Sequence, residues 1–141
     1  MVAIPVPRAR PWILVADDDP NIRRLFVTLL REGGYRPIEA TTGREALELM
    51  RLVAPELVVL DLRMPELTGQ DVLNYIRTTY VIRQTPVLVV SGHLEDIDGL
   101  DLGLNVVGRL QKPVDAMTLL QAVERALAAA SPARPGVPPA R

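Results

Sequence analysis

The chain has 141 residues, of which 48% are hydrophobic, 23% charged and 4% aromatic, and it has no cysteine. This length suits one domain with its own core, and the lack of cysteine excludes disulfides and thiolate metal sites. A net charge of −1 provides no broad positive field for nucleic acid, and no apolar run resembles a signal peptide or could span a bilayer. We therefore expect a cytoplasmic domain without direct contacts to nucleic acid or membrane.

Prolines are concentrated at the two ends of the chain. Because proline has no backbone N–H to donate, residues 1–11 and 131–141 are predicted to be extended tails. The folded body is then residues 12–130, and no internal repeat divides it.

The body begins with an apolar run, residues 12–16, that ends in three consecutive aspartates at 17–19. Asp19 followed by Pro20 is typical of a helix start. Apolar residues then recur at helical spacing until Gly33 ends the pattern. The sequence therefore predicts a strand, a short acidic loop and an amphipathic helix.

A similar alternation continues through the middle of the chain. Residues 35–40 predict a weaker strand, and Thr42 caps the helix that follows it. Residues 57–60 are an apolar run that ends at Asp61. The next helix begins at Thr68 with the spacing of a capping box.

Two strands and a helix complete the pattern. Residues 86–90 predict a strand that ends at Ser91, and residues 106–110 a shorter strand that ends before Lys112. Asp115 caps the last helix.

Strands that are apolar throughout and alternate with helices indicate a parallel sheet covered on both faces. Right-handed crossovers make this a doubly wound α/β fold, in which the site lies beyond the carboxyl ends of the strands. The polar side chains at those ends are the candidate site residues: Asp17, Asp18, Asp61, Ser91 and Lys112.

Three carboxylates at one edge of a sheet repel one another unless a cation lies between them, and oxygen ligands suit Mg²⁺. A carboxylate beside such an ion can attack a phosphoryl group, which makes Asp61 the candidate nucleophile. Lys112 would supply positive charge and Ser91 a hydroxyl donor. The alternative is that each residue alone only caps a helix or solvates a loop, and their joint placement on successive strands argues against it.

Four segments carry a family resemblance: residues 13–19, 60–65, 89–92 and 111–113. In this order they resemble the motifs of the receiver domain of bacterial response regulators, of the single-domain kind found in chemotaxis regulators. The resemblance implies a five-stranded, flavodoxin-like sheet of order 2-1-3-4-5 with helices on both faces. It also implies a cis peptide bond between Lys112 and Pro113.

The resemblance further implies phosphorylation of Asp61, a switch hydroxyl at Ser91 and an assisting lysine at Lys112. It implies Mg²⁺ contacts through two carboxylates, a backbone carbonyl and one carboxylate acting through water: Asp18, Asp61, Arg63 and Asp17.

Such a domain takes its phosphoryl group from a sensor histidine kinase or a histidine phosphotransfer protein. It is a phosphorelay component that catalyses only its own phosphorylation and dephosphorylation. We expect no second domain after the body, and therefore expect its output through its own surface or by passing the phosphoryl group onward. The downstream protein stays unidentified, and a homodimer stays open.

The sequence departs from the family pattern in two places. Receivers commonly have Tyr or Phe three residues before the lysine, and Arg109 stands there instead. Residues 94–103 contain two glycines and four acidic residues, which predicts a short, irregular or mobile segment where receivers have their fourth helix. The alternative for both is a surface without a signalling role.

Two side chains are predicted to tune the lifetime of the phosphoryl group. Arg63 can fold over the phosphoryl oxygens and keep water away. The imidazole of His93 can orient the attacking water or block it. The alternative is that both point into solvent.

Two other readings compete with a phosphorylated receiver. A phosphatase of the haloacid-dehalogenase type needs an acid two residues after its nucleophile, but Arg63 stands there relative to Asp61, and Pro20 and Asn21 follow the first acidic group. A pseudo-receiver would bind a partner without phosphorylation, and the full set of aspartate, serine and lysine argues against it.

Overall fold

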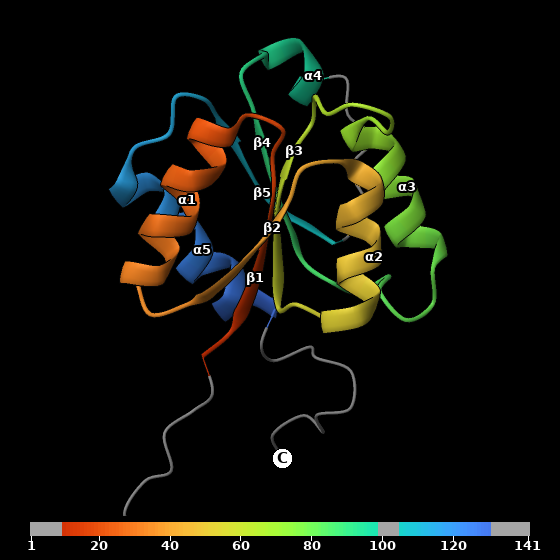
Figure 1. Cartoon of the computed structure of the whole chain (residues 1–141), viewed down its shortest axis with the longest axis horizontal. Coiled ribbons are helices and arrows are strands. Elements are labelled where there is room, and N and C mark those ends of the chain that lie inside the picture. The colour runs from red at the N-terminus through yellow and green to blue at the C-terminus, as the bar shows by residue number, and fades with distance from the viewer. Residues whose placement is uncertain (1–9, 99–104, 131–141) are drawn as a thin grey trace, which may run out of the picture.

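The computed structural model of the chain describes residues 10–98 and 105–130. Its centre is a five-stranded sheet of order β2-β1-β3-β4-β5 in which all neighbouring strands are parallel (Figure 1). The strands are β1 (Trp12–Ala16), β2 (Arg36–Ala40), β3 (Leu57–Asp61), β4 (Val87–Ser91) and β5 (Val106–Gln111). The predicted doubly wound α/β fold with strand order 2-1-3-4-5 is therefore confirmed.

Helices cover both faces of the sheet. Within the described residues they are α1 (Pro20–Glu32), α2 (Gly43–Val53), α3 (Gly69–Thr78), α4 (Leu94–Asp98) and α5 (Ala116–Ala130). Figure 1 shows α1 and α5 on one side, α2 and α3 on the other, and α4 beyond the carboxyl ends of the strands. None of these helices combines the length and apolar character needed to cross a membrane.

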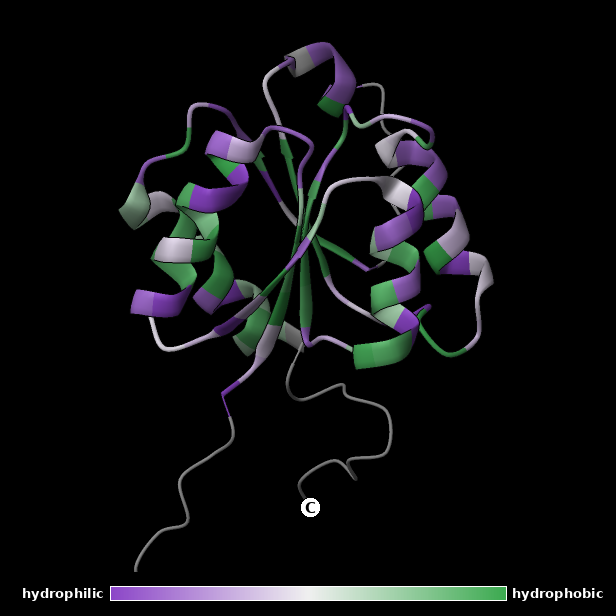
Figure 2. Cartoon of the chain, in the orientation of Figure 1, coloured by the Kyte–Doolittle hydropathy of each residue, from purple (hydrophilic) through white to green (hydrophobic). Residues whose placement is uncertain are grey.

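The apolar strands bury side chains on both faces of the sheet. In β1, Ile13 and Val15 pack with the residues of α1 and α5, whereas Leu14 and Ala16 pack with those of α2 and α3. Figure 2 shows the strands and the inner helix faces as the hydrophobic parts of the fold. Each large aliphatic side chain that is fully buried in this way stabilises the fold by about 1.5–3 kcal/mol. Burial on both faces explains why the strands are uniformly apolar rather than alternating.

Side-chain caps set where the helices begin. A carboxylate oxygen of Asp19 accepts hydrogen bonds from the backbone N–H groups of Asn21 (2.8 Å) and Ile22 (3.4 Å). Thr68 and Asp71 exchange reciprocal hydrogen bonds of 3.1 Å, which confirms the predicted capping box. Because Asp19 caps α1, the two preceding aspartates remain at the end of β1 for another role.

The segment predicted to form a poor helix, residues 94–103, is helical over the five residues of α4 in its described part. Residues 99–104 lie outside the described residues, as do residues 1–9 and 131–141 of the predicted tails. Because α4 reaches the last described residue before this gap, both the length of the helix and the mobility of the segment stay predictions.

Candidate functional site

The polar residues predicted from strand ends gather at the carboxyl edge of the sheet. Asp17 and Asp18 follow β1, Asp61 ends β3, Ser91 ends β4 and Lys112 follows β5. Because β1 and β3 are neighbours in the sheet, their acidic residues meet where the order of strands reverses. The structure therefore brings the predicted groups to one edge.

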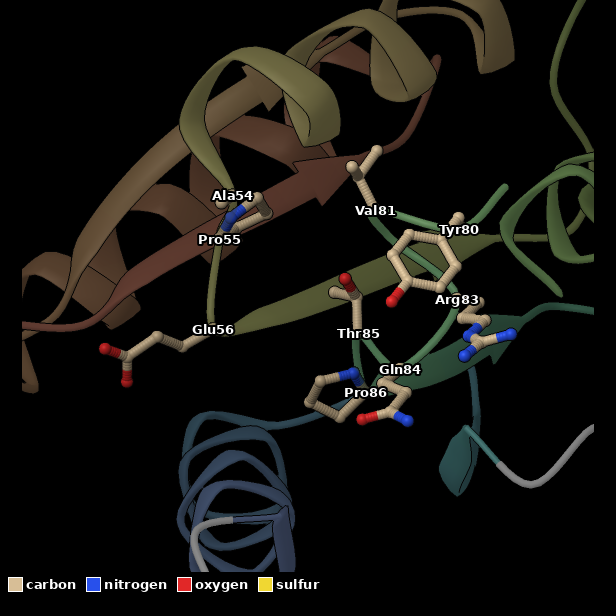
Figure 3. Close-up of a pocket in the computed structure, with 9 residues that line it drawn as sticks. All are labelled: Ala54, Pro55, Glu56, Tyr80, Val81, Arg83, Gln84, Thr85 and Pro86. Atoms are coloured by element: carbon tan, nitrogen blue, oxygen red, sulfur yellow. The ribbon is translucent and has the colours of Figure 1, made fainter. Parts of the chain in front are cut away.

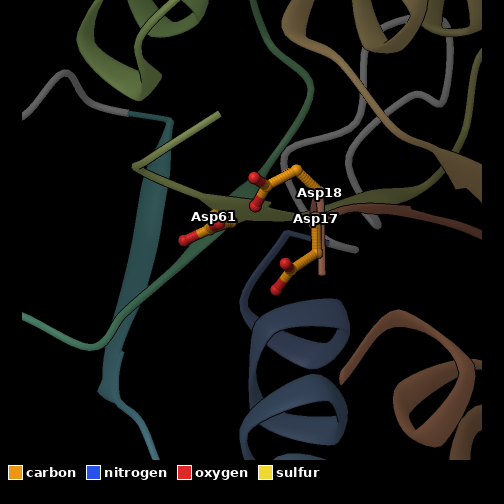
Figure 4. A group of neighbouring side chains, drawn as sticks. All are labelled: Asp17, Asp18 and Asp61. Carbon is orange, nitrogen blue, oxygen red and sulfur yellow. The ribbon is translucent and has the colours of Figure 1, made fainter. Parts of the chain in front are cut away.

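The three aspartates form a compact cluster (Figure 4). Their carboxylate oxygens, one from each residue, lie within 4.8 Å of one another. Asp17 and Asp61 are buried, with exposures of 2% and 5%, whereas Asp18 is exposed. The backbone N–H of Asp19 donates to Asp17 Oδ1 at 2.9 Å, which orients that side chain. Two of the three negative charges are thus largely shielded from water.

Lys112 supplies a positive charge to this cluster. Its ammonium donates to Asp17 Oδ2 at 2.7 Å and lies 3.4 Å from Asp61 Oδ1. Its backbone N–H donates to the carbonyl of Ser91 at 2.7 Å, and the bond to Pro113 is cis, as the resemblance predicted. Burial lowers the pKa of Lys112, but its hydrogen bond to Asp17 and the charge of Asp61 outweigh this and raise it above 10.5. The lysine is therefore charged at neutral pH.

One ammonium does not balance three carboxylates. Burial and the charge of Asp17 raise the pKa of Asp61 from 3.8 to about 6, although Lys112 and the backbone N–H of Arg63 act in the opposite direction. A divalent cation among the carboxylates would relieve this repulsion, and a set of oxygen donors suits Mg²⁺. The residues present therefore fit the magnesium site predicted from the sequence.

Ser91 is fully buried at the end of β4. Its hydroxyl accepts a hydrogen bond from the backbone N–H of His93 at 3.2 Å. As a donor, the hydroxyl lies 3.4 Å from the carbonyl oxygen of His93 and 3.5 Å from Asp96 Oδ2. Both donor distances are at the long end for a hydroxyl, so this hydrogen can be redirected at little cost.

The side chains of the three residues proposed for switching and lifetime contact groups other than Asp61 or are exposed. Arg63 Nε donates to Asp96 Oδ2 at 2.6 Å, so its guanidinium is turned toward α4. The imidazole of His93 is half exposed, with Nδ1 3.6 Å from a carboxylate oxygen of Glu95. Arg109 is exposed on β5, where Val89 of β4 is its neighbour in register.

Asp96 is the residue near the site that sequence reasoning missed. Its hydrogen bond with Arg63 lowers its pKa below 3.8, so it is ionised at neutral pH. Arg63 and Asp96 are 33 positions apart in the chain, so no local pattern links them. The sequence feature that could have pointed to Asp96 is the acidic character of the segment that follows Ser91.

A separate pocket of about 480 Å³ lies at the opposite end of the sheet (Figure 3). It is lined by residues that precede β3 and β4: Ala54, Pro55, Glu56, Tyr80, Val81, Arg83, Gln84, Thr85 and Pro86. None of the predicted site residues lines it, so it is distinct from the acidic cluster.

The family model of the response regulator receiver domain matches residues 13–124, which include every candidate site residue. The chain belongs to the response-regulator receiver family. Receiver domains are the phosphorelay components of two-component systems, and the predicted role in signal transduction is therefore confirmed at the level of the family.

Relatives and solved structures agree with this assignment. The receiver is 36% identical over 127 residues to protein Rrf1 of Nitratidesulfovibrio vulgaris, with 89% of each chain covered. It is 32% identical over 106 residues to the transcriptional regulatory protein BaeR of Escherichia coli, covering 75% of this chain but 42% of that protein. The structure of the chemotaxis response regulator CheY4 of Vibrio cholerae superposes with a TM-score of 0.74 at 25% identity, over 84% of this chain and 99% of that one.

Proposed function

We propose that this receiver accepts a phosphoryl group on Asp61 from a sensor histidine kinase or a histidine phosphotransfer protein. The observation that carries the proposal is the surroundings of the Asp61 carboxylate. It is buried at the end of β3, 3.4 Å from the ammonium of Lys112, in a cluster with Asp17 and Asp18. A carboxylate in such a position is poised for nucleophilic attack on phosphorus.

In the proposed transfer, a carboxylate oxygen of Asp61 forms a bond to phosphorus while the phosphorus–nitrogen bond of the donor phosphohistidine breaks. The electron pair of the broken bond stays on the imidazole nitrogen, which takes up a proton. Lys112 is positioned to neutralise charge on the transferred group, and the Ser91 hydroxyl to donate to one of its oxygens. The product is an acyl phosphate on Asp61.

Asp17, Asp18 and Asp61 would hold the Mg²⁺, with the backbone carbonyl of Arg63 as a further contact and Asp17 acting through water. When bound, the ion neutralises charge on the phosphoryl oxygens. The donor set and the raised pKa of Asp61 support this assignment.

The activity we propose is limited to the domain's own phosphorylation and dephosphorylation, in the cytoplasm. We propose residues 12–130 as the receiver body. We also propose that Arg63 and His93 affect the lifetime of the phosphoryl group and that Arg109 takes part in switching. In this structure Arg63 donates a hydrogen bond to Asp96, which it would have to leave to reach the phosphoryl group.

Intact-mass measurement after incubation with acetyl phosphate and magnesium chloride tests this function. We expect a mass gain of one phosphoryl group, which a chelator prevents. If the protein gains no mass from acetyl phosphate or from a phosphorylated histidine kinase, the pseudo-receiver alternative is favoured instead.

Asp18→Asn is expected to weaken Mg²⁺ binding on the order of tenfold or more, because it removes one of the charges that attract the ion. Asp18 is exposed, so the fold should tolerate the change. Calorimetric titration of Mg²⁺ into both proteins measures the difference. Asp98→Asn, which removes a charge from an exposed position of α4, serves as the matched control, and an equal loss in both variants would contradict the assignment.

A further inference from the structure

The carboxylate of Asp96 lies near side chains from the loop after β3 and from the end of β4, both close to Asp61. Arg63 Nε and Nη2 donate to its two oxygens at 2.6 and 3.3 Å, and Ser91 Oγ lies 3.5 Å from Oδ2. Arg63 follows β3 and Ser91 ends β4, whereas Asp96 belongs to α4. One side chain of α4 thus lies near both the loop after Asp61 and the end of the adjacent strand β4.

Both donors are anchored close to Asp61. The backbone N–H of Arg63 donates to Asp61 Oδ1 at 3.4 Å, and Asp61 pairs with Val90, the neighbour of Ser91, in the sheet. A phosphoryl group on Asp61 would therefore form within a short distance of the backbone of both residues. Its three oxygens are acceptors of the kind that guanidinium and hydroxyl groups bind strongly.

We propose that Asp96 is a positioning residue that holds the guanidinium of Arg63 before phosphorylation and releases it to the phosphoryl group. This inference rests on the proposed function. The Nε–Nη2 edge of Arg63 is taken up by the two oxygens of Asp96. The one hydrogen of the Ser91 hydroxyl can go to Asp96 Oδ2 at 3.5 Å or to the carbonyl of His93 at 3.4 Å, so Asp96 holds Ser91 only weakly. Asp96 and the phosphoryl group therefore compete for the guanidinium of Arg63, and phosphorylation breaks the hydrogen bonds between Asp96 of α4 and the loop after β3.

The contact is specific to Asp96 within α4. Glu95 lies farther from the guanidinium, at 3.9 Å, and also faces His93. The side chain of Asp96 is only 25% exposed, whereas that of Glu95 is 73% exposed. The charge of Glu95 therefore attracts Arg63 less strongly, and Glu95→Gln and Asp98→Asn are suitable charge-matched controls.

The test is the time course of phosphorylation by acetyl phosphate with Mg²⁺, followed by decay after donor removal, both measured by intact mass. Asp96→Asn should be phosphorylated about two- to fivefold faster, the range that a partly exposed ion pair supplies, and should lose the group more slowly. Asp96→Glu keeps the carboxylate and should return toward the wild-type rate. Glu95→Gln and Asp98→Asn should remain close to wild type.

A double-mutant cycle tests whether Asp96 acts through the guanidinium of Arg63. In an Arg63→Ala background, where the guanidinium is gone, most of the effect of Asp96→Asn should disappear. Three results would each overturn the inference. Wild type and Asp96→Asn could be phosphorylated at equal rates, Asp96→Asn could accelerate phosphorylation as much in the Arg63→Ala background, or Asp98→Asn could accelerate it equally. If wild type itself gains no phosphoryl group, both the proposed function and this inference fail. If wild type is phosphorylated but Asp96→Asn does not change the rate, only the inference about Asp96 fails.

Discussion

Asp61→Asn is expected to abolish the mass gain from acetyl phosphate and Mg²⁺. The amide has almost the shape of the carboxylate, so packing at the end of β3 is preserved, but a neutral amide is a poor nucleophile toward phosphorus. It also removes the charge next to Lys112 and one of the three carboxylates of the acidic cluster. Intact mass at several donor concentrations measures the loss, which we expect to be complete.

The control for this substitution is Asp98→Asn, which changes the net charge equally at an exposed position of α4 and should be phosphorylated. Persistent phosphorylation of Asp61→Asn would contradict Asp61 as the sole acceptor. Ser91 would then be the first residue to examine, since its hydroxyl lies at the end of the adjacent strand. Mild alkali distinguishes the two products, because an acyl phosphate hydrolyses under conditions in which a serine phosphate survives.

Most of the fold could be predicted because its signals are local. Apolar runs with polar ends define the strands, and the caps at Asp19 and Thr68 define helix starts within a residue or two. The acidic cluster could also be predicted, although Asp17 and Asp61 are far apart in the chain, because the carboxyl ends of parallel strands meet at one edge. The sheet topology therefore brings residues from separate strand ends into one site.

The surroundings of Arg63 could not be predicted in the same way. The direction of its guanidinium depends on where α4 is placed, and α4 lies in a segment with weak helical composition. The ion pair with Asp96 is a tertiary contact between the loop after β3 and α4, and no periodicity of the sequence encodes it. The exposed position of Arg109 has a similar origin, because β5 is an edge strand with alternate residues exposed. Side-chain partners at the rim of the site follow from packing rather than from local pattern.

The metal-free protein is expected to lose stability as the pH rises from about 4 through about 6. Burial and the charge of Asp17 raise the pKa of Asp61 to about 6 in the folded state, against 3.8 as the ordinary value. The folded state therefore holds the proton more tightly than the unfolded state. The resulting stabilisation is fully present below pH 4 and is lost as the pH passes the folded-state pKa. A difference of about two pKa units corresponds to roughly 2–3 kcal/mol.

Asp61→Asn isolates this effect, because its side chain is uncharged at every pH. In chelator, urea unfolding should show the variant more stable than wild type by roughly 2–3 kcal/mol at pH 7.5, with the difference shrinking toward zero near pH 4. Asp98→Asn, at an exposed position, should follow wild type at both pH values. Mg²⁺ at pH 7.5 should then stabilise wild type more than Asp61→Asn, since binding to the folded state alone raises the free energy of unfolding. A stability difference between wild type and Asp61→Asn that is independent of pH would show that burial and the charge of Asp17 do not destabilise the ionised Asp61 carboxylate. It would thereby contradict the expectation that a cation is needed to relieve repulsion in the acidic cluster.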